Sequence, residues 1–463
     1  MAISSIGVGS GLEVDKILSQ LRQVENQALQ LVQNKQVQNT QRISAYGKLK
    51  NAIENLQKAG NALNNEDTYG AVKVSSSSEL ISVTGSPKAS AGQYSLTVNN
   101  VATSQTLLAN GQASRTDAIG TGGSLTITLA NGDEHTIDLD GQDTSLNGIM
   151  RAVNADPKSG VTATLINDGT NAPHRLLFTA RDTGTQASVV SIDVQDNAAL
   201  SDVLSYSQAP GATNALTATA AQNAEIEING ITITQQSNTL KDTIEGLTID
   251  ISKAKSGEQI NLSVSRDDSV ASEAIKTFVS VYNTLNNTIR ELTRYDVDSQ
   301  TGAALTGDSL VRRAQNSMQQ ALGFALDAGD IRTLSQLGIT TDPSSGELKL
   351  DEETLKKGLE NHLGDVKRLF LGDDALGKRI DEAGKLFTKK EGFIDSALEG
   401  AQRTEKLLRD QYDATEYRIE NKLEAYRRQF SQLDTMMSQM QGLSSYLTQQ
   451  LSMLSNLNSS SNK

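Results

Sequence analysis

The sequence predicts an α+β multidomain protein, in which both termini form an antiparallel helical bundle or coiled coil that carries inserted antiparallel β domains. Apolar residues recur at heptad spacing near both ends of the chain, which is typical of coiled coils. Short runs between residues 72 and 265 alternate apolar and polar residues, as half-buried strands do. The simplest packing therefore folds the two ends together and leaves the β region as an insertion between helices near residues 70 and 268.

The first helical pattern starts close to the amino terminus. Gaps of three and four residues separate the apolar positions Val14, Ile17, Leu21, Val24, Ala28 and Leu31. Across residues 33–42 only Val37 is apolar, and the pattern then resumes from Ala45 to Leu63. The sequence therefore predicts two helices here, or one interrupted helix.

The leader before this pattern, SSIGVGSG at residues 4–11, suggests two functions that its context excludes. A secretory signal needs a basic segment and then a continuous apolar core, but here Ser and Gly separate Ile3, Ile6 and Val8. A phosphate-binding loop needs a strand before its glycines, and only six residues precede Gly7. We interpret the leader as a flexible segment that ends near the start of a helix.

The middle of the chain is rich in Gly, Thr, Ser and Asn. Its alternating runs span residues 80–85, 94–101, 124–140, 161–166, 175–180, 225–234, 247–252 and 260–265. Because Asn-Gly and Ser-Gly pairs separate several of them, we expect antiparallel strands joined by hairpins. The apolar face of each run is thin, which predicts half-exposed sheets.

Helical spacing returns after residue 266. Asp268 or Ser269 is the predicted N-cap of a helix over residues 269–293. A second helix is expected after GDSL at 307–310, and then a hairpin in LGITTDPSSGELKLD with its turn at residues 342–346.

The last long pattern runs from Leu408 to Leu454 without a proline between residues 395 and 457, so a helix of roughly 90 Å is possible. Charged residues surround its apolar positions between 403 and 428, whereas beyond 430 only Asp434 and Lys463 carry side-chain charge. We expect this uncharged part to become ordered when it packs against copies of itself or a partner.

Composition limits the classes of partner. A formal charge of −13 and an isoelectric point near 4.9 argue against nucleic acid or an anionic membrane as the main partner. No run of 18 apolar residues occurs, so we expect no membrane insertion. The chain has no cysteine, which suits both a chain passed unfolded between redox compartments and a cytosolic protein.

Candidate catalytic or metal-binding residues do not emerge from the sequence. His135, His174 and His362 lie in separate contexts without a metal-ligand spacing, and we interpret them as surface or edge residues. The segment IDLDGQD at 137–143 lacks the acidic twelfth ligand of a calcium loop and reads as a solvated strand face. We therefore predict no catalytic, cofactor or metal site and no enzyme.

Several segments resemble one known family. These segments are SSIGVGSGLEVDKILSQL at the amino terminus, AYGKL at 45–49, QYSLTVNNVATSQTL at 93–107, EIEINGITITQQSNTLKDTIEGLTIDI at 225–251, FVSVYNTL at 278–285 and LGITTDPSSGELKLDEETL at 337–355. They are similar to the flagellar filament cap family, FliD, also called hook-associated protein 2. Across residues 105–220 the resemblance rests on position alone.

The resemblance implies an extracellular protein at the distal tip of the bacterial flagellum, exported unfolded by the flagellar type III apparatus without a cleavable signal. Such proteins form a homo-oligomeric ring that promotes folding and insertion of flagellin. Implied partners are other copies, flagellin, hook-filament junction proteins and a cytosolic export chaperone on the C-terminal helix. Some members bind host mucin, a role that would fall to the outer β region.

The same resemblance divides the chain by function. It implies an N-terminal leg over 1–42, a helical body over 43–71 and 268–429, an inner β domain over 72–104 and 222–267, an outer β domain over 105–221, and a C-terminal leg over 430–463. The predicted filament leg seam comprises Ile17, Leu21, Val24, Leu31, Phe430, Leu433, Met437, Met440, Leu447 and Leu451. The predicted helical body includes Phe278, Leu285, Ile289, Leu423 and Tyr426.

Two other classes share parts of this pattern. Flagellin and the hook-filament junction proteins also place helical, weakly charged termini around β domains, but the 337–351 hairpin and the 225–251 block favour the cap family. A surface adhesin with a coiled-coil stalk would carry a cleavable signal or an anchor, and neither is visible in the sequence.

Overall fold

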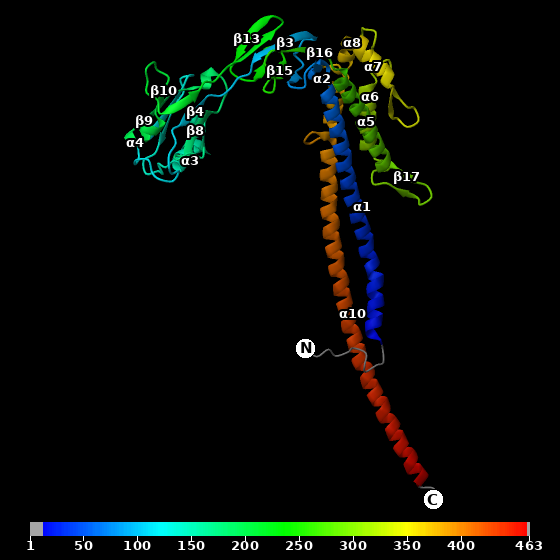
Figure 1. Cartoon of the computed structure of the whole chain (residues 1–463). Helices are drawn as coiled ribbons and strands as arrows, with labels where there is room; N and C mark the ends of the chain where they lie inside the picture. The colour runs from blue at the N-terminus through cyan, green and yellow to red at the C-terminus, as the bar shows by residue number, and fades with distance from the viewer. Residues whose placement is uncertain (1–12, 461–463) are drawn as a thin grey trace. The chain divides into compact units, whose positions relative to one another are not determined.

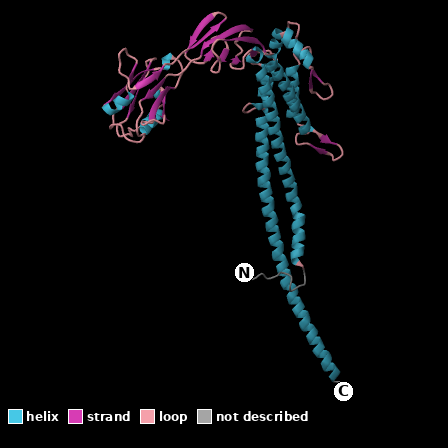
Figure 2. Cartoon of the chain, in the orientation of Figure 1, coloured by secondary structure: helices cyan, strands magenta, loops and turns pink. Residues whose placement is uncertain are grey.

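The computed structural model describes the backbone of residues 13–460 and the side chains of residues 13–453. Two compact units divide the chain, one of Met1–Asn65 with Ser272–Lys463 and one of Glu66–Ala271. Long helices dominate the first unit and antiparallel sheets the second (Figures 1 and 2), which confirms the predicted α+β class. The leader at 1–12 and the side chain of Leu454 lie outside the described residues.

The amino-terminal pattern forms one helix, α1 (Val14–Leu63), so the predicted interruption does not occur. The polar stretch at 33–42 remains helical because Gln, Lys and Arg have high helix propensity. It also finds polar partners on the helix beside it. The amide of Asn39 donates to the backbone oxygen of Ala401 at 2.9 Å and to the carboxylate of Glu405 at 2.8 Å.

The carboxyl-terminal pattern forms helix α10 (Phe393–Ser460), which runs antiparallel beside α1 (Figure 1). Two polar contacts record the direction of pairing. Asn39 lies opposite Glu405, and nearer the start of α1 the carboxylate of Glu25 pairs with Lys422. A rising residue number on α1 therefore matches a falling number on α10.

Helix α9 (Leu376–Thr388) packs closely against the second half of α1. A Cβ atom added to Gly377 would lie 2.6 Å from the backbone oxygen of Gly60, so the two backbones approach more closely there than a side chain allows. Buried Gln57 completes the contact. It donates to the backbone oxygen of Asp381 at 3.1 Å and accepts from the hydroxyl of Thr388 at 2.9 Å.

The remaining elements of this unit are α5 (Asp268–Thr293), β17 (Tyr295–Asp296), β18 (Thr301–Gly302), α6 (Ser309–Leu322), β19 (Ile339–Thr341), β20 (Leu348–Leu350), α7 (Glu352–Asn361) and α8 (Leu363–Phe370). The predicted hairpin is confirmed as the antiparallel pair β19–β20, and Asn283 on α5 holds it through two hydrogen bonds to Leu348. The N-cap prediction for α5 was wrong by one residue. Asp267 accepts the Ser269 amide at 3.0 Å, because the helix already begins at Asp268.

The second unit contains a first β core, here called the inner β core. After α2 (Asp67–Gly70) it comprises β1 (Val72–Ser76), β2 (Ser82–Gly85), β3 (Gly92–Asn100), β12 (Ala224–Ile228), β13 (Ile231–Gln235), β14 (Thr239–Lys241), β15 (Leu247–Asp250) and β16 (Glu258–Arg266). Its sheets have the orders β1-β16-β3-β12-β13 and β14-β15-β2. Alternate residues of β16, namely Ile260, Leu262 and Val264, are buried, as the period of two predicted.

The second core is called the outer β core. Its elements lie between β3 and β12 in the sequence, so the chain leaves the inner core to form it and then returns. It comprises β4 (Thr106–Ala109), β5 (Ser124–Leu129), β6 (Glu134–Asp138), α3 (Leu146–Ala155), η1 (Pro157–Ser159), β7 (Val161–Asn167), β8 (His174–Ala180), η2 (Thr185–Ala187), β9 (Val189–Gln195), α4 (Ala198–Leu204), β10 (Tyr206–Ser207) and β11 (Leu216–Thr219). The sheets β10-β9-β5-β6 and β11-β4-β8-β7 share one cluster of buried residues with α3 and α4.

The sequence did not predict α3 and α4. Both helices are short, and each is started by a polar side chain in a Gly- and Ser-rich region that reads as a loop. Ser145 accepts the Gly148 amide at 3.2 Å, and Asn197 accepts the Leu200 amide at 3.0 Å. Such caps satisfy backbone amides that a helix start leaves without partners.

Polar contacts join the two β cores. The hydroxyl of Thr183 donates to the backbone oxygen of Gln236 at 2.8 Å, and the amide of Gln186 donates to its side-chain oxygen at 3.0 Å. Asn223 accepts the Thr185 amide at 2.7 Å. The two clusters of buried apolar residues have no member in common. The inner and outer β cores are therefore joined by these hydrogen bonds and by the two chain segments that connect them.

The close crossing of α1 and α9 yields a stability prediction. Gly377→Ala is expected to lower the free energy of unfolding by about 1–3 kcal/mol, because the new methyl group collides with a backbone oxygen. Denaturant unfolding followed by circular dichroism measures this change.

Gly400→Ala on α10 is the matched control. The nearest heavy atom to its added Cβ is 4.0 Å away and belongs to a side chain, so the same substitution should leave stability unchanged or raise it by up to about 1 kcal/mol. Equal effects of the two substitutions would contradict the close-packing explanation.

Candidate interaction surfaces

Helix α10 extends past the described part of α1. Equal steps along the two helices from the Glu25–Lys422 ion pair reach Val14 on α1 and Leu433 on α10. Figure 1 shows α10 continuing alone beyond this level. Beyond Leu433, α10 no longer packs against the described part of α1. We call residues 433–453 the free segment of α10.

The free segment exposes a line of large apolar side chains. The exposed fractions are 42% for Leu433, 64% for Met440, 52% for Leu447 and 66% for Leu451. Spacings of seven, seven and four residues place all four on one face of the helix. The predicted seam residues Phe430 and Met437 lie half-buried on the same helix.

The seam residues predicted on α1 lie along one stripe of the helix but differ in exposure. Ile17 and Leu21 are half-buried, whereas Val24 is 61% and Leu31 is 65% exposed. The face toward α10 instead continues through Glu25, which pairs with Lys422. An apolar heptad pattern could not reveal this face, because polar residues occupy part of it. Val24 and Leu31 remain available as surface residues.

The residues predicted for one helical body fall into two places. Phe278, Leu285 and Ile289 are buried on α5. Leu423 and Tyr426 are half-buried on α10, where Leu423 lines a hollow of about 500 Å³ together with Leu18 of α1.

A polar contact shows how far apart along α1 the α5 residues and Leu423 lie. Tyr46 donates to Asp308, the N-cap of α6, at 2.6 Å. Leu18, beside Leu423, is roughly 40 Å further along α1 at the rise of an α-helix. The distal part of residues 403–428 therefore lies beside α1.

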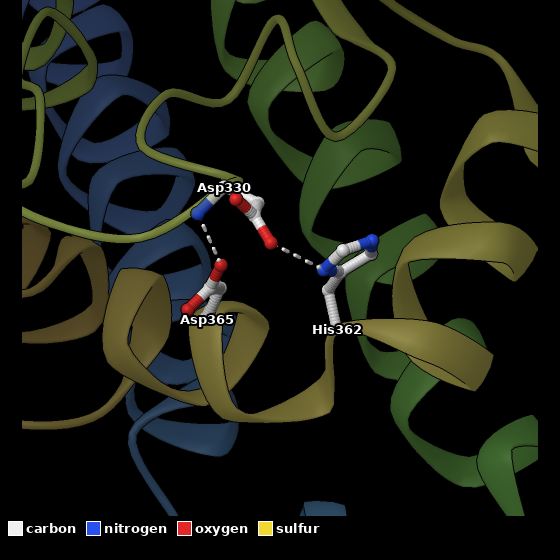
Figure 3. Close-up of side chains that lie close together, drawn as sticks. All are labelled: Asp330, His362 and Asp365. Atoms are coloured by element: carbon white, nitrogen blue, oxygen red, sulfur yellow. Dashed lines mark hydrogen bonds and ion pairs between the residues drawn. The ribbon is translucent and has the colours of Figure 1, made fainter.

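One charged cluster was not expected from the sequence. Ligand atoms of Asp330, His362 and Asp365 lie within 4.8 Å of one another, and Nδ1 of His362 is 3.3 Å from the carboxylate of Asp330 (Figure 3). His362 is exposed, as predicted. More than 30 positions separate Asp330 from the other two, so no sequence spacing signals the cluster.

Hydrogen bonds already engage the Asp365 carboxylate. It accepts the backbone amides of Asp330 and Ile331 at 2.7 and 3.0 Å (Figure 3 shows the first), and it pairs with Arg368. The Ile331 amide and then the Arg368 guanidinium lower the pKa of Asp365 to about 2. This geometry fits a clamp that fastens the loop before β19 to helix α8.

The other two histidines also have ordinary partners. His135 pairs with the carboxylate of Asp156, and the backbone of His174, the first residue of β8, forms a bridge with Gln112. None of the helices within residues 13–460 combines the length and hydropathy needed to cross a bilayer.

Comparison with known proteins identifies the class. The sequence model described as "Flagellar hook-associated protein 2 N-terminus" matches residues 10–105, and "Flagellar hook-associated protein 2 C-terminus" matches residues 221–442. Flagellar hook-associated protein 2 of Escherichia coli K12 is 35% identical over 468 residues, which cover 98% of this chain and 99% of the relative. The Salmonella typhimurium protein of the same name is 33% identical, over 97% and 98% of the two chains.

A solved structure agrees in fold. The crystal structure of the flagellar cap protein FliD D1-D2-D3 domains from Escherichia coli covers 77% of this chain and 99% of its own, with a TM-score of 0.69 and 33% identity. Fold and sequence together define a structural protein of the flagellar cap class. The chain belongs to the flagellar hook-associated protein 2 family, which confirms the resemblance.

The Asp365 clamp predicts a pH dependence. A carboxyl group with a lowered pKa stabilises the fold above its unfolded value of about 4, and this contribution is lost as pH falls through about 2. Asp365→Asn should lower the melting temperature at neutral pH. The difference from the parent protein should shrink as pH falls from about 4 to about 2.

Thermal unfolding at a series of pH values measures this difference. Asp373→Asn serves as the control, because Asp373 is exposed in the loop after α8. A deficit of Asp365→Asn that persists unchanged at the lowest pH would contradict the ionic clamp.

Proposed function

We propose that this chain is a subunit of the flagellar filament cap. Copies form a ring at the distal tip of the extracellular filament, and the ring promotes folding and insertion of exported flagellin without covalent chemistry. The flagellar cap protein from Escherichia coli, similar over 77% of this chain, supports the role. Export through the flagellar type III apparatus is part of the proposal, and the absence of cysteine suits a chain that crosses compartments unfolded.

The free segment of α10 is the observation that carries this proposal. A line of exposed Leu and Met side chains on a weakly charged helix is unfavourable in water. In the proposed cap, flagellin subunits at the filament mouth cover this line. Methionines such as Met440 suit a surface that accepts successive partners, because their side chains adapt to different contacts.

The same proposal gives binding roles to other parts of the chain. Residues 430–457 are the proposed binding segment for a cytosolic export chaperone before secretion, and the exposed Val24 and Leu31 on α1 contribute to the leg. Buried Phe278, Leu285 and Ile289 support the body of the subunit. Hook-filament junction proteins are the proposed neighbours at the base of the filament, and any binding of host mucin falls to the outer β core.

Paired substitutions in the free segment test the function. Met440→Asp with Leu447→Asp places two charges on the apolar face of α10. In a strain that lacks its own cap protein, this variant should restore little or no filament growth, and flagellin should accumulate in the medium because it is not retained at the tip. Filament length by electron microscopy and flagellin in the culture supernatant measure the result.

The matched control is Ser438→Asp with Ser445→Asp, which has the same spacing and charge on the opposite side of the helix. This variant should support filament growth, and circular dichroism of both purified variants should resemble that of the parent protein. Normal filaments with the first pair, or equal loss with both, would refute the role given to the apolar line.

A further inference from the structure

A short arm projects between α5 and α6. Strands β17 and β18 form its antiparallel stem (Figure 1). The Asp296 carboxylate accepts the backbone amides of Asp298 and Ser299 at 3.0 and 3.1 Å, which fixes the turn. At the base, Leu305 is 1% exposed and its amide bonds to the backbone oxygen of Leu292 at 2.9 Å. The arm is therefore an ordered structure anchored in the helical unit.

The tip of this arm presents an apolar side chain between two acids. Val297 is 76% exposed and Tyr295 is 54% exposed. Asp296 and Asp298 flank Val297, and residues 295–303 contain no basic side chain. The carboxylate of Asp298 has no hydrogen bond or ion pair with any residue in the described part of the chain. The tip therefore offers one apolar side chain and this carboxylate to a partner.

Helix α6 presents the complementary chemistry. Its sequence contains two arginines and no acidic residue. Arg312, Arg313, Asn316 and Gln320 of this one helix line an open, shallow hollow of about 540 Å³ that runs along most of its length. Arg313 lies over the ring of Phe393, with 4.9 Å from its guanidinium carbon to the ring centroid, whereas the Arg312 guanidinium has no ion pair within residues 13–460. The lining of this hollow, which we call the α6 hollow, is polar and basic and therefore suits an acidic ligand.

The base of the arm and the first turn of the α6 hollow lie at the same level of the helical unit. The arm leaves α5 after Thr293, and α6 begins at Ser309. Neighbouring subunits of a ring differ by a rotation about its axis, so groups that meet between them lie at equal heights. In a ring whose axis runs along the long helices, an arm from one subunit can reach the α6 hollow of the next. Since the two surfaces differ, the contact is of the head-to-tail kind that closes rings.

We propose that the arm tip of one copy, with Val297 and Asp298, docks in the α6 hollow of the adjacent copy, where Asp298 pairs with Arg312. The occupant of the hollow is a second copy of this chain. This contact rests on the proposed ring and specifies how neighbouring subunits join.

Cysteine cross-linking tests the contact directly, because the natural chain has no cysteine. The full-length double variant Val297→Cys with Asn316→Cys is oxidised and separated on a non-reducing gel. Head-to-tail docking should give a ladder that extends beyond dimers, since each copy has both a donor and an acceptor. Val297→Cys with Thr404→Cys on α10 is the control, and it should give no ladder beyond dimers. Only monomers and dimers from the first variant would overturn the contact.

Charge reversal provides a second test in solution. Asp298→Arg or Arg312→Asp alone should raise the concentration at which half of the protein is assembled about tenfold or more, and the combination of both should restore assembly. Sedimentation velocity on full-length protein measures this concentration. Ile231→Asp, a substitution at a 66% exposed apolar residue of β13, should leave it unchanged.

The outcomes separate the arm contact from the ring itself. A parent protein that assembles, together with single reversals that assemble equally well, overturns the arm contact and leaves the proposed cap function intact. A parent protein that stays monomeric at all concentrations, without cross-linked ladders, overturns both the ring and the arm contact.

Discussion

The antiparallel pairing of α1 with α10 is the contact on which the helical unit depends. It joins segments from opposite ends of the chain, so Glu66–Ala271 folds as an insertion between two parts of one unit. Loop-closure entropy rises only with the logarithm of loop length, which makes such a large insertion tolerable. Asn39 and Glu25 meet polar partners on α10, and these contacts favour one register among those that apolar contacts alone would permit.

Unequal helix lengths connect this pairing to function. α1 has 50 residues and α10 has 68, so antiparallel pairing leaves the end of α10 without the cover that α1 provides elsewhere. The same helix therefore serves as structural support over one part and as an exposed apolar surface over the other. A transition from charged residues before 428 to Ser, Thr and Gln beyond 430 follows this change of role along α10.

Periodicity in the sequence predicted the fold class, the long carboxyl-terminal helix, the helical character of the amino-terminal segment and most strands, because each of these buries one repeating face. Periodicity did not predict surfaces on which buried residues follow no regular spacing. The inward face of α1 contains Glu25 and Asn39, so the apolar heptad pattern did not coincide with it, and Val24 and Leu31 of that pattern are exposed. Clustering of Asp330 with His362 depends on loop closure across more than 30 positions, which no local spacing records.

The family to which the chain belongs could be predicted from segments in the helical unit and the inner β core. The α6 hollow had no sequence signal, because arginines on a helix surface are ordinary. It becomes apparent only when the fold brings the hollow level with the arm. Local conformation can thus be predicted from this sequence, whereas sites formed between distant elements can be identified only from the tertiary structure.

The hydrogen-bonded junction between the two β cores makes their apolar packing separable. Its contacts use Gln236, Asn223 and the backbone around Thr185, and the apolar clusters on either side have no common member. Replacement of the outer core would leave the apolar packing of the inner core untouched. The two family matches end at residue 105 and begin again at residue 221. The two family models thus cover the inner core and the helical unit, and the outer core lies in the interval between them.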